Sequence, residues 1–276
     1  MAFTAADVKR LREETDAPMM ECNAALKEAD GDYDRAKQIL REKGKAAAAK
    51  RADRTTSAGV VAFSTSADHK HVGAVVLESE TDFVAKNEQF IQLAQEIAEI
   101  FLHNDPGNDP LAVKHGDRTV GEIIEAAVAT IRENIKITKA LHLSTENQFA
   151  TYIHHDNTKA SIIEITGSDD QTRNVGRSVA IQTVAFPPEV VKKDDLPQDK
   201  IAAEIETETQ RAIAEGKDEN IARNIATGRV NKEYIKRVVL LEQPFYADAA
   251  KSVGQFLSEE AKGHNILGFT YLAVGQ

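Results

Sequence analysis

Residues 72–103 constrain the fold of this chain more than any other stretch of similar length. Residues 72–77 are apolar apart from one glycine, which predicts a buried β-strand. Residues 87–103 predict an α-helix, because Asn87 can cap its first free amides and Glu88 places a negative charge in its first turn. A buried strand that leads into a capped helix indicates a mixed fold in which helices pack on a sheet.

The segment that joins this strand to this helix, Thr81–Asn87, places an acid beside a large aromatic residue. Loops between regular elements carry function more often than the elements themselves. Two interpretations of Phe83 follow. It folds back into the core of its own domain, as most phenylalanines do, or it is presented outward as an anchor for a pocket on a partner.

Composition excludes several classes of protein. Apolar residues make up 42% and charged residues 28% of the 276 residues, which is typical of a soluble globular protein with room for two or three modest domains. The formal net charge of −10 disfavours nonspecific binding to nucleic acid or to an anionic membrane. No apolar run approaches the roughly 18 residues of a membrane span, and residues 1–4 show no secretory signal. We therefore expect a cytoplasmic protein with no direct nucleic-acid or membrane partner.

The first part of the chain, residues 1–45, predicts three short helices. Thr4 can cap the first helix, with Asp7 three residues later, and Asp16 can cap the second. Gly44 is expected to end the third helix. A compact three-helix unit of this size is usually a small docking module.

A pattern of two strands followed by a helix then occurs twice. It predicts two α+β subdomains, each with an antiparallel sheet. The segments of the first copy are 60–63, 72–77 and 87–103, and those of the second are 137–143, 152–154, 160–165 and a helix near 174–185.

Capping signals and one final strand complete the core. Thr119 and Glu122 predict a capping box for a helix that runs to about residue 134. Ser252 and Gln255 predict another, and an apolar strand over 266–274 should return to one of the two sheets.

Residues 187–230 predict an antiparallel helical hairpin. Ile201, Ile205 and Ala212 form a narrow apolar stripe on its first helix, and Ile221 and Ile225 form one on its second. A stripe of this width on two consecutive helices favours packing of each helix against the other.

No set of residues predicts an active site. Cys22 is the only cysteine, so a disulfide within the chain and a thiolate metal cluster are excluded, and we expect it to be a small buried residue on a helix. His69 with His71, and His154 with His155, form pairs on expected hairpins, but two ligands do not fix a metal ion. The chain has no phosphate-binding glycine-rich loop and no serine nucleophile elbow. We predict a protein that is not an enzyme, needs no metal ion or cofactor, and acts on another protein. A metal hydrolase built on the histidine pairs is an alternative.

Several separated motifs resemble one family. The segment Thr81–Asn87 is similar to the signature of the bacterial translation elongation factor Ts family, the nucleotide exchange factors for elongation factor Tu. Further motifs match in the family's order along nearly the whole chain: Leu11–Thr15, Met19–Cys22, Ala25–Leu26, Ala29–Asp32, Tyr152–His154, Gly228–Lys232 and Leu240–Phe245. Agreement at so many separated places is not expected by chance.

The resemblance implies an α+β fold with an N-terminal three-helix (UBA-like) domain, two antiparallel-sheet core subdomains and an inserted antiparallel helical hairpin, or coiled coil. The expected boundaries are 1–55 for the three-helix domain and its linker, 56–140 for the N-terminal core subdomain, 141–186 with 231–276 for the C-terminal core subdomain, and 187–230 for the hairpin.

The resemblance also implies guanine nucleotide exchange on GDP-bound elongation factor Tu during translation elongation. It places a loop made of Thr81, Asp82, Phe83 and Val84 near the magnesium site of the GTPase. Phe83 would then wedge between two helices of the partner, and Asp82 would disturb the groups that hold the magnesium ion. The further GTPase contacts that the resemblance implies are Ile131 and His154, toward the phosphate loop, and Leu11 and Arg12 in the three-helix domain.

The chain departs from the family pattern at several positions that bear on these contacts. Arg132 stands where a glycine is usual, Asp16 and Pro18 replace glycines, and Asn23 and Ala24 replace lysines. A non-catalytic docking or chaperone-like module that acts through the three-helix domain is the alternative function. The sequence leaves open whether the hairpin docks on the GTPase or on a second copy of the chain, and so whether a homodimer forms.

Overall fold

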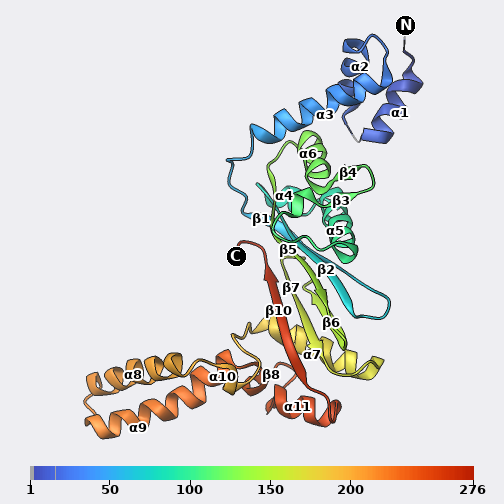
Figure 1. The fold of residues 1–276 in the computed structure, drawn as a ribbon. Coiled ribbons are helices and arrows are strands. Elements are labelled where there is room, and N and C mark those ends of the chain that lie inside the picture. The colour runs from blue at the N-terminus through green and yellow to red at the C-terminus, as the bar shows by residue number, and fades with distance from the viewer. Residues whose placement is uncertain (1–2, 16) are drawn as a thin grey trace. The chain divides into compact units, whose positions relative to one another are not determined.

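The computed structural model describes residues 3–15 and 17–276 and divides into two compact units (Figure 1). The first unit contains the chain up to Ser66, His71–Ser144 and Leu272–Gln276. The second contains Ala67–Lys70 and Thr145–Tyr271. The predicted α+β class is confirmed, because helices pack on antiparallel sheets in both units. The finer division into four parts stays a prediction.

The first unit holds the helices and strands that precede residue 145. They are α1 (Ala5–Thr15), α2 (Met19–Glu28), α3 (Tyr33–Ala49), β1 (Ala58–Thr65), β2 (His71–Ser79), α4 (Asp82–Ala85), α5 (Glu88–His103), β3 (Lys114–His115), β4 (Arg118–Thr119), α6 (Val120–Ile131) and β5 (Ile135–Ser144).

The helices α1, α2 and α3 share a small core of their own. The predicted cap of α1 forms, since the main-chain N–H of Asp7 donates to Thr4 Oγ1 at 3.3 Å. Cys22 is buried in this core, as predicted, and burial raises the pKa of its thiol. The predicted cap at Asp16 lies outside the described residues.

Helix α3 corrects the expectation that Gly44 ends the third helix. It continues to Ala49, and Gly44 lies buried within it. A Cβ atom at Gly44 would lie 3.5 Å from the main-chain oxygen of Glu125. That distance is an ordinary contact, so an alanine would also fit between α3 and α6, and the glycine lies inside the helix without ending it.

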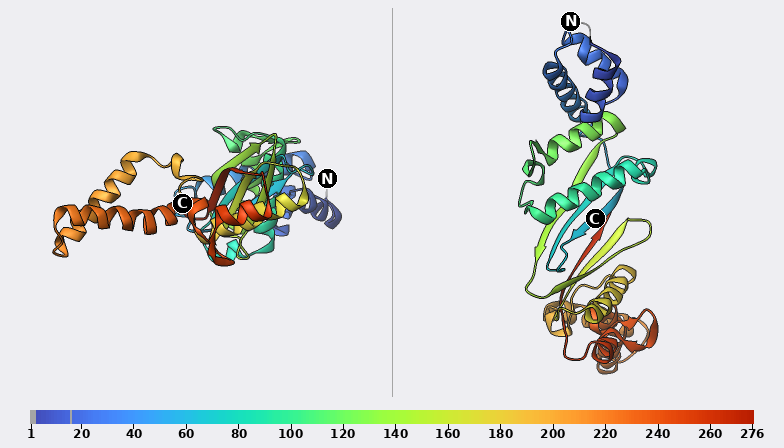
Figure 2. Two further views of the ribbon diagram at one scale, coloured as in Figure 1. Left: turned by 90° about the horizontal axis from the view of Figure 1, so that it is seen from below. Right: turned by 90° about the vertical axis from the view of Figure 1, so that its right-hand side faces the viewer.

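The first sheet has the strand order β1-β2-β5, with both pairings antiparallel. Helix α5 covers one face of it (Figure 2), and apolar residues of the sheet, α5 and α6 form one core. Strand β2 comes very close to α5 at Gly73, where a Cβ atom would lie 2.1 Å from a main-chain atom of α5. The predicted cap of α5 also forms, because Asn87 accepts from the main-chain N–H of Gln89 at 2.8 Å.

Strand β5 is a second correction. We expected residues 137–143 to open the second sheet, but β5 pairs with β2 and completes the first. Its alternating side chains identify it as a strand, but alternation does not determine which strand it pairs with.

The predicted capping box of α6 is confirmed, with Glu122 N–H donating to Thr119 Oγ1 at 3.2 Å. The helix ends at Ile131 rather than near residue 134, because Arg132 adopts a left-handed conformation with φ 67°.

The second unit holds a sheet of strand order β10-β7-β6 and the remaining helices. Its elements are β6 (Gln148–Ile153), β7 (Lys159–Ile165), α7 (Asp170–Ala185), α8 (Gln198–Ala214), α9 (Glu219–Arg229), α10 (Ile235–Val238), β8 (Pro244–Phe245), β9 (Asp248–Ser252), α11 (Val253–Glu260) and β10 (Ile266–Ala273). Helix α7 packs on β6 and β7, and the final strand returns to a sheet as predicted.

Helices α8 and α9 form the predicted antiparallel hairpin (Figure 1). Ala212 of the predicted stripe on α8 is fully buried, but the stripe predicted on α9 is wrong at Ile221, which is 54% exposed. Ala222 and Ala226 are fully buried instead, since small side chains let the two helices approach closely. No helix in the described part of the chain is long and apolar enough to cross a membrane.

Candidate functional site

The segment after β2, predicted as a loop, forms one helical turn. Thr81 is the N-cap of α4, and its hydroxyl accepts from the main-chain N–H of Val84 at 3.4 Å. Asn87 then caps α5 directly afterwards. With caps at both ends, the turn between strand and helix has a defined conformation.

This turn presents Phe83 to solvent. Phe83 is 84% exposed, whereas Ala85 is buried and Val84 packs against the core of the first unit. Successive residues of a helical turn point about 100° apart, so burying Val84 and Ala85 directs Phe83 outward. Leaving a phenylalanine in water forgoes about 1.5–3 kcal/mol of burial free energy. Phe83 therefore does not fold back into the core of its own domain, which is the first of the two interpretations.

Asp82 lies beside Phe83 and carries a negative charge. The Lys86 ammonium donates to Asp82 Oδ2 at 2.6 Å and holds the pKa of that carboxyl below its usual value. Both side chains are largely exposed, and exposed ion pairs contribute little stability. Asp82 can therefore exchange Lys86 for a cationic group or a metal-bound water of a partner at small cost.

Ile131 lies in the same unit as Phe83, at the C-terminal end of α6. It is half-buried and packs against the core of this unit. Arg132 follows in its left-handed conformation, and its carbonyl accepts from Arg51 Nε at 3.0 Å. The core contact of Ile131 and the hydrogen bond from Arg51 thus fix the end of α6, while part of the Ile131 side chain stays accessible to solvent.

His154 belongs to the second unit, directly after β6. Its main-chain N–H donates to the Lys159 carbonyl at 2.9 Å, which closes the β6–β7 hairpin. Its ring lies 3.4 Å from the Tyr152 hydroxyl and packs edge-on against His155, with 4.3 Å between ring centroids. Within residues 3–15 and 17–276, no three His, Cys, Asp or Glu side chains come together in a way that could hold a metal ion.

The three-helix segment corrects one predicted contact. Leu11 is fully buried in the core of α1, α2 and α3, so it cannot touch a partner while that core is intact. Arg12 is exposed on the same helix. The exposed apolar side chains here are Met19 and Met20, 48% and 85% exposed at the start of α2.

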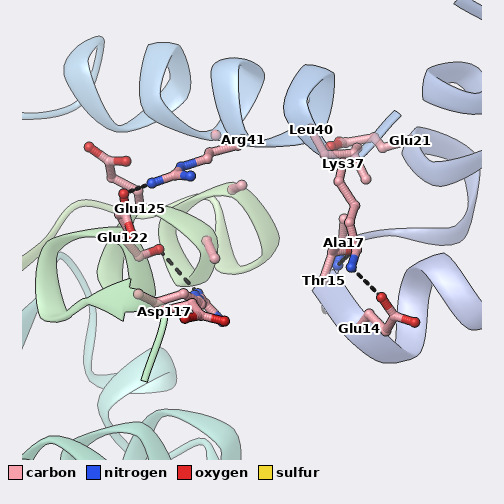
Figure 3. Close-up of a pocket in the computed structure, with 14 residues that line it drawn as sticks. Glu14, Thr15, Ala17, Glu21, Lys37, Leu40, Arg41, Asp117, Glu122 and Glu125 are labelled. Carbon is pink, nitrogen blue, oxygen red and sulfur yellow. Dashed lines mark hydrogen bonds and ion pairs between the residues drawn. The ribbon is translucent and has the colours of Figure 1, made fainter. Parts of the chain in front are cut away.

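A cavity of about 310 Å³ lies beside α3 and α6 (Figure 3). Ion pairs join residues that line it, Arg41 with Glu122 and Lys37 with Glu14. Because these charges bind other parts of the chain, we place the functional site at the Phe83 turn rather than in this cavity.

Comparisons with known proteins identify the family. Residues 80–276 match the family described as "Elongation factor TS". The chain belongs to the elongation factor Ts family.

Relatives in this family cover nearly the full length of the chain. The protein named "Elongation factor Ts" from Chloroherpeton thalassium is 41% identical over 271 residues, which are 95% of this chain and 93% of that protein. Those of Aquifex aeolicus and Amoebophilus asiaticus are 36% and 38% identical and cover all of this chain. The elongation factor Ts match begins at Glu80, so it includes the Phe83 turn, Ile131 and His154.

Proposed function

We propose that this chain is a guanine nucleotide exchange factor that binds GDP-bound elongation factor Tu and accelerates GDP release during translation elongation. Its place of action would be the cytoplasm. Family membership supports the activity, and the outward Phe83 ring is the observation that supports the mechanism.

Phe83 acts as a wedge in this mechanism. A GTPase holds its nucleotide through main-chain amides at the phosphates, a helix N-terminus and a coordinated magnesium ion. An aromatic ring inserted between two helices near that ion separates the groups that bind it. Asp82, beside the ring, attracts or displaces cationic ligands of the same site. Neither residue takes part in covalent chemistry.

One wedge is not sufficient for a large acceleration. Burial of one phenylalanine contributes about 1.5–3 kcal/mol, whereas a thousandfold faster release needs about 4 kcal/mol. A second contact on the phosphate side must supply the remainder. Ile131 and His154 are the residues we propose for it, because Ile131 is accessible at a helix end and His154 at a hairpin turn.

Binding of this protein to the GTPase must weaken the binding of GDP, and binding of GDP must weaken the binding of this protein. If this chain weakens the grip of the GTPase on GDP, then GDP weakens the grip of the GTPase on this chain by the same factor. The exchange factor is thus released when a new nucleotide binds, without chemistry of its own.

The test is GDP release from elongation factor Tu loaded with a fluorescent GDP. We expect wild-type protein to accelerate release in a concentration-dependent way, and Phe83→Ala to slow that release by about ten- to hundredfold, the rate equivalent of the lost burial. Phe186→Ala is the matched control, since Phe186 is another exposed phenylalanine, in the second unit. Release at wild-type speed in Phe83→Ala, with the fold intact, would refute the wedge.

The alternative is a docking or chaperone-like module that acts through α1, α2 and α3. The exposed Met19 and Met20 favour it, because exposed methionines suit adaptable binding surfaces. The same assay separates the two functions. A docking module leaves the GDP release rate independent of its concentration, and Met20→Ser then weakens binding while Phe83→Ala does not.

A further inference from the structure

Side chains extend the pairing of β2 with β5 beyond the last main-chain pair. That pairing ends at Ser79 and Ile135. The next pair in the same register is Glu80 with Asn134, and the main-chain N–H of Asn134 donates to Glu80 Oε1 at 2.7 Å. A carboxylate therefore does here what a main-chain carbonyl does within the sheet.

Two hydrogen bonds connect the following pair, Thr81 and Glu133. The Thr81 main-chain N–H donates to Glu133 Oε2 at 3.0 Å, and the Thr81 hydroxyl donates to Oε1 at 2.7 Å. Because its proton is directed at Glu133, the hydroxyl offers a lone pair to the Val84 N–H. Glu133 thus sets the orientation of the hydroxyl that caps α4.

The two loops joined in this way carry two of the proposed GTPase contacts. Phe83 follows Thr81 by two residues, and Ile131 precedes Glu133 by two. Hydrogen bonds to an ionised carboxylate are shorter and about twice as strong as neutral ones. Glu133 therefore ties the Phe83 turn to the end of α6 more firmly than a neutral residue could.

We propose that Glu133 is a positioning residue for nucleotide exchange, which holds Phe83 and Ile131 so that they engage the GTPase as one rigid unit. This inference rests on the proposed function. A wedge that is already ordered spends none of its binding free energy on ordering itself, so more of that energy is available to separate the groups around the nucleotide.

Its neighbour Asn134 has a different role. Asn134 is 4% exposed, and its side-chain amide donates to the carbonyls of Ala52 and Arg54 at 3.3 and 2.7 Å. It secures the connection before β1 and is structural. The side-chain bonds of Glu133 described above end on the Phe83 turn alone, so its substitution should loosen that turn and spare the core.

Glu133→Gln tests the inference in the full chain. The amide oxygen can accept from the Thr81 N–H while the amide NH2 donates to the Thr81 hydroxyl, so the charge that strengthens both hydrogen bonds is lost and the hydroxyl proton is no longer directed at this side chain. We expect the maximal rate of GDP release to fall about tenfold, while the half-saturating concentration of exchange factor changes less than about twofold. Glu96→Gln is the control, because Glu96 is an exposed acid on α5 of the same unit.

Amide hydrogen exchange of the free protein gives a second measurement that needs no GTPase. We expect faster exchange over residues 81–86 in Glu133→Gln than in wild type, with β2 and α5 unchanged. Unchanged exchange there, or a release rate equal to wild type, overturns the inference. The inference is also overturned if slower GDP release by Glu133→Gln appears only together with a lower melting temperature of the whole first unit. If wild-type protein itself fails to release GDP, the proposed function fails, and the hydrogen exchange result still decides whether Glu133 orders the turn.

Discussion

At the scale of single residues, exposure of Phe83 was the point that the sequence left open. A turn of four residues is too short for periodicity to show which side chain faces inward. The direction of Phe83 depends on Val84 and Ala85 finding places against the core of the first unit, which are contacts with distant parts of the chain. For the same reason Glu133 gave no signal, since its partner Thr81 lies 52 positions away.

Arg132 offers a prediction at this scale, because its φ of 67° suits glycine better than any residue with a Cβ atom. We expect Arg132→Gly to be more stable than Arg132→Ala by about 1 kcal/mol, since alanine keeps the left-handed strain and the glycine does not. Both variants lose the same exposed ion pair with Glu21, so it cancels in the comparison.

Urea unfolding of the two Arg132 variants measures this difference. An alanine variant as stable as the glycine variant would show that the conformation carries no strain. The glycine variant also allows a closer main-chain approach at the end of α6, so its GDP release rate at low protein concentration should equal or exceed that of wild type.

At the scale of helices and strands, local signals predicted well and distant pairings did not. The caps formed by Thr4, Asn87, Thr119 and Ser252 were all predicted, because a cap needs only residues within three positions. The partner of β5 was not, because any strand with the right alternation could fill that place. The Thr81–Val84 turn was located by its motif, although its helical form was not foreseen.

Helix α1 supports a prediction about pH. Lys37 of α3 and Arg10 donate to Glu14 and lower the pKa of its carboxyl from 4.5 to about 2. A carboxyl whose pKa is lower in the folded state stabilises folding above its ordinary pKa, and that stability is lost as the pH falls from 4.5 toward 2. We therefore expect the melting temperature of the three-helix segment to fall over this range, and Glu14→Gln to show a flatter dependence.

Circular dichroism melts at several values of pH between 5 and 2 measure the effect. Glu13→Gln is the matched control, because Glu13 is the adjacent acid and its contact with Lys9 is longer, at 3.6 Å between exposed groups. If Glu14→Gln and Glu13→Gln give the same slope as wild type, the ion pairs of Glu14 do not contribute to acid stability.

At the scale of the whole molecule, the end of the chain belongs to its first unit. Ala67–Lys70 and Thr145–Tyr271 form the second unit, whereas Leu272–Gln276 return to the first. The contact is made at Glu78, a carboxylate of β2 that is only 5% exposed. Glu78 accepts from Thr56 Oγ1 at 2.8 Å and from the Gly275 main-chain N–H at 3.0 Å. A buried acid near the end of an apolar strand needs donors such as these from distant parts of the chain, which the sequence could not reveal.

Removal of the last residues should therefore destabilise the first unit. We expect deletion of Gly275 and Gln276 to lower its free energy of unfolding by about 1–3 kcal/mol, because a buried carboxylate loses a donor. The new terminal carboxylate at Val274 would also lie near Glu78 and repel it. Deletion of Gln276 alone is the control, since it keeps the Gly275 N–H. Hydrogen exchange of the amides of β2 reports the stability of this unit separately from the second. Equal protection of β2 in both deletions would show that the end of the chain adds nothing to the unit it rejoins.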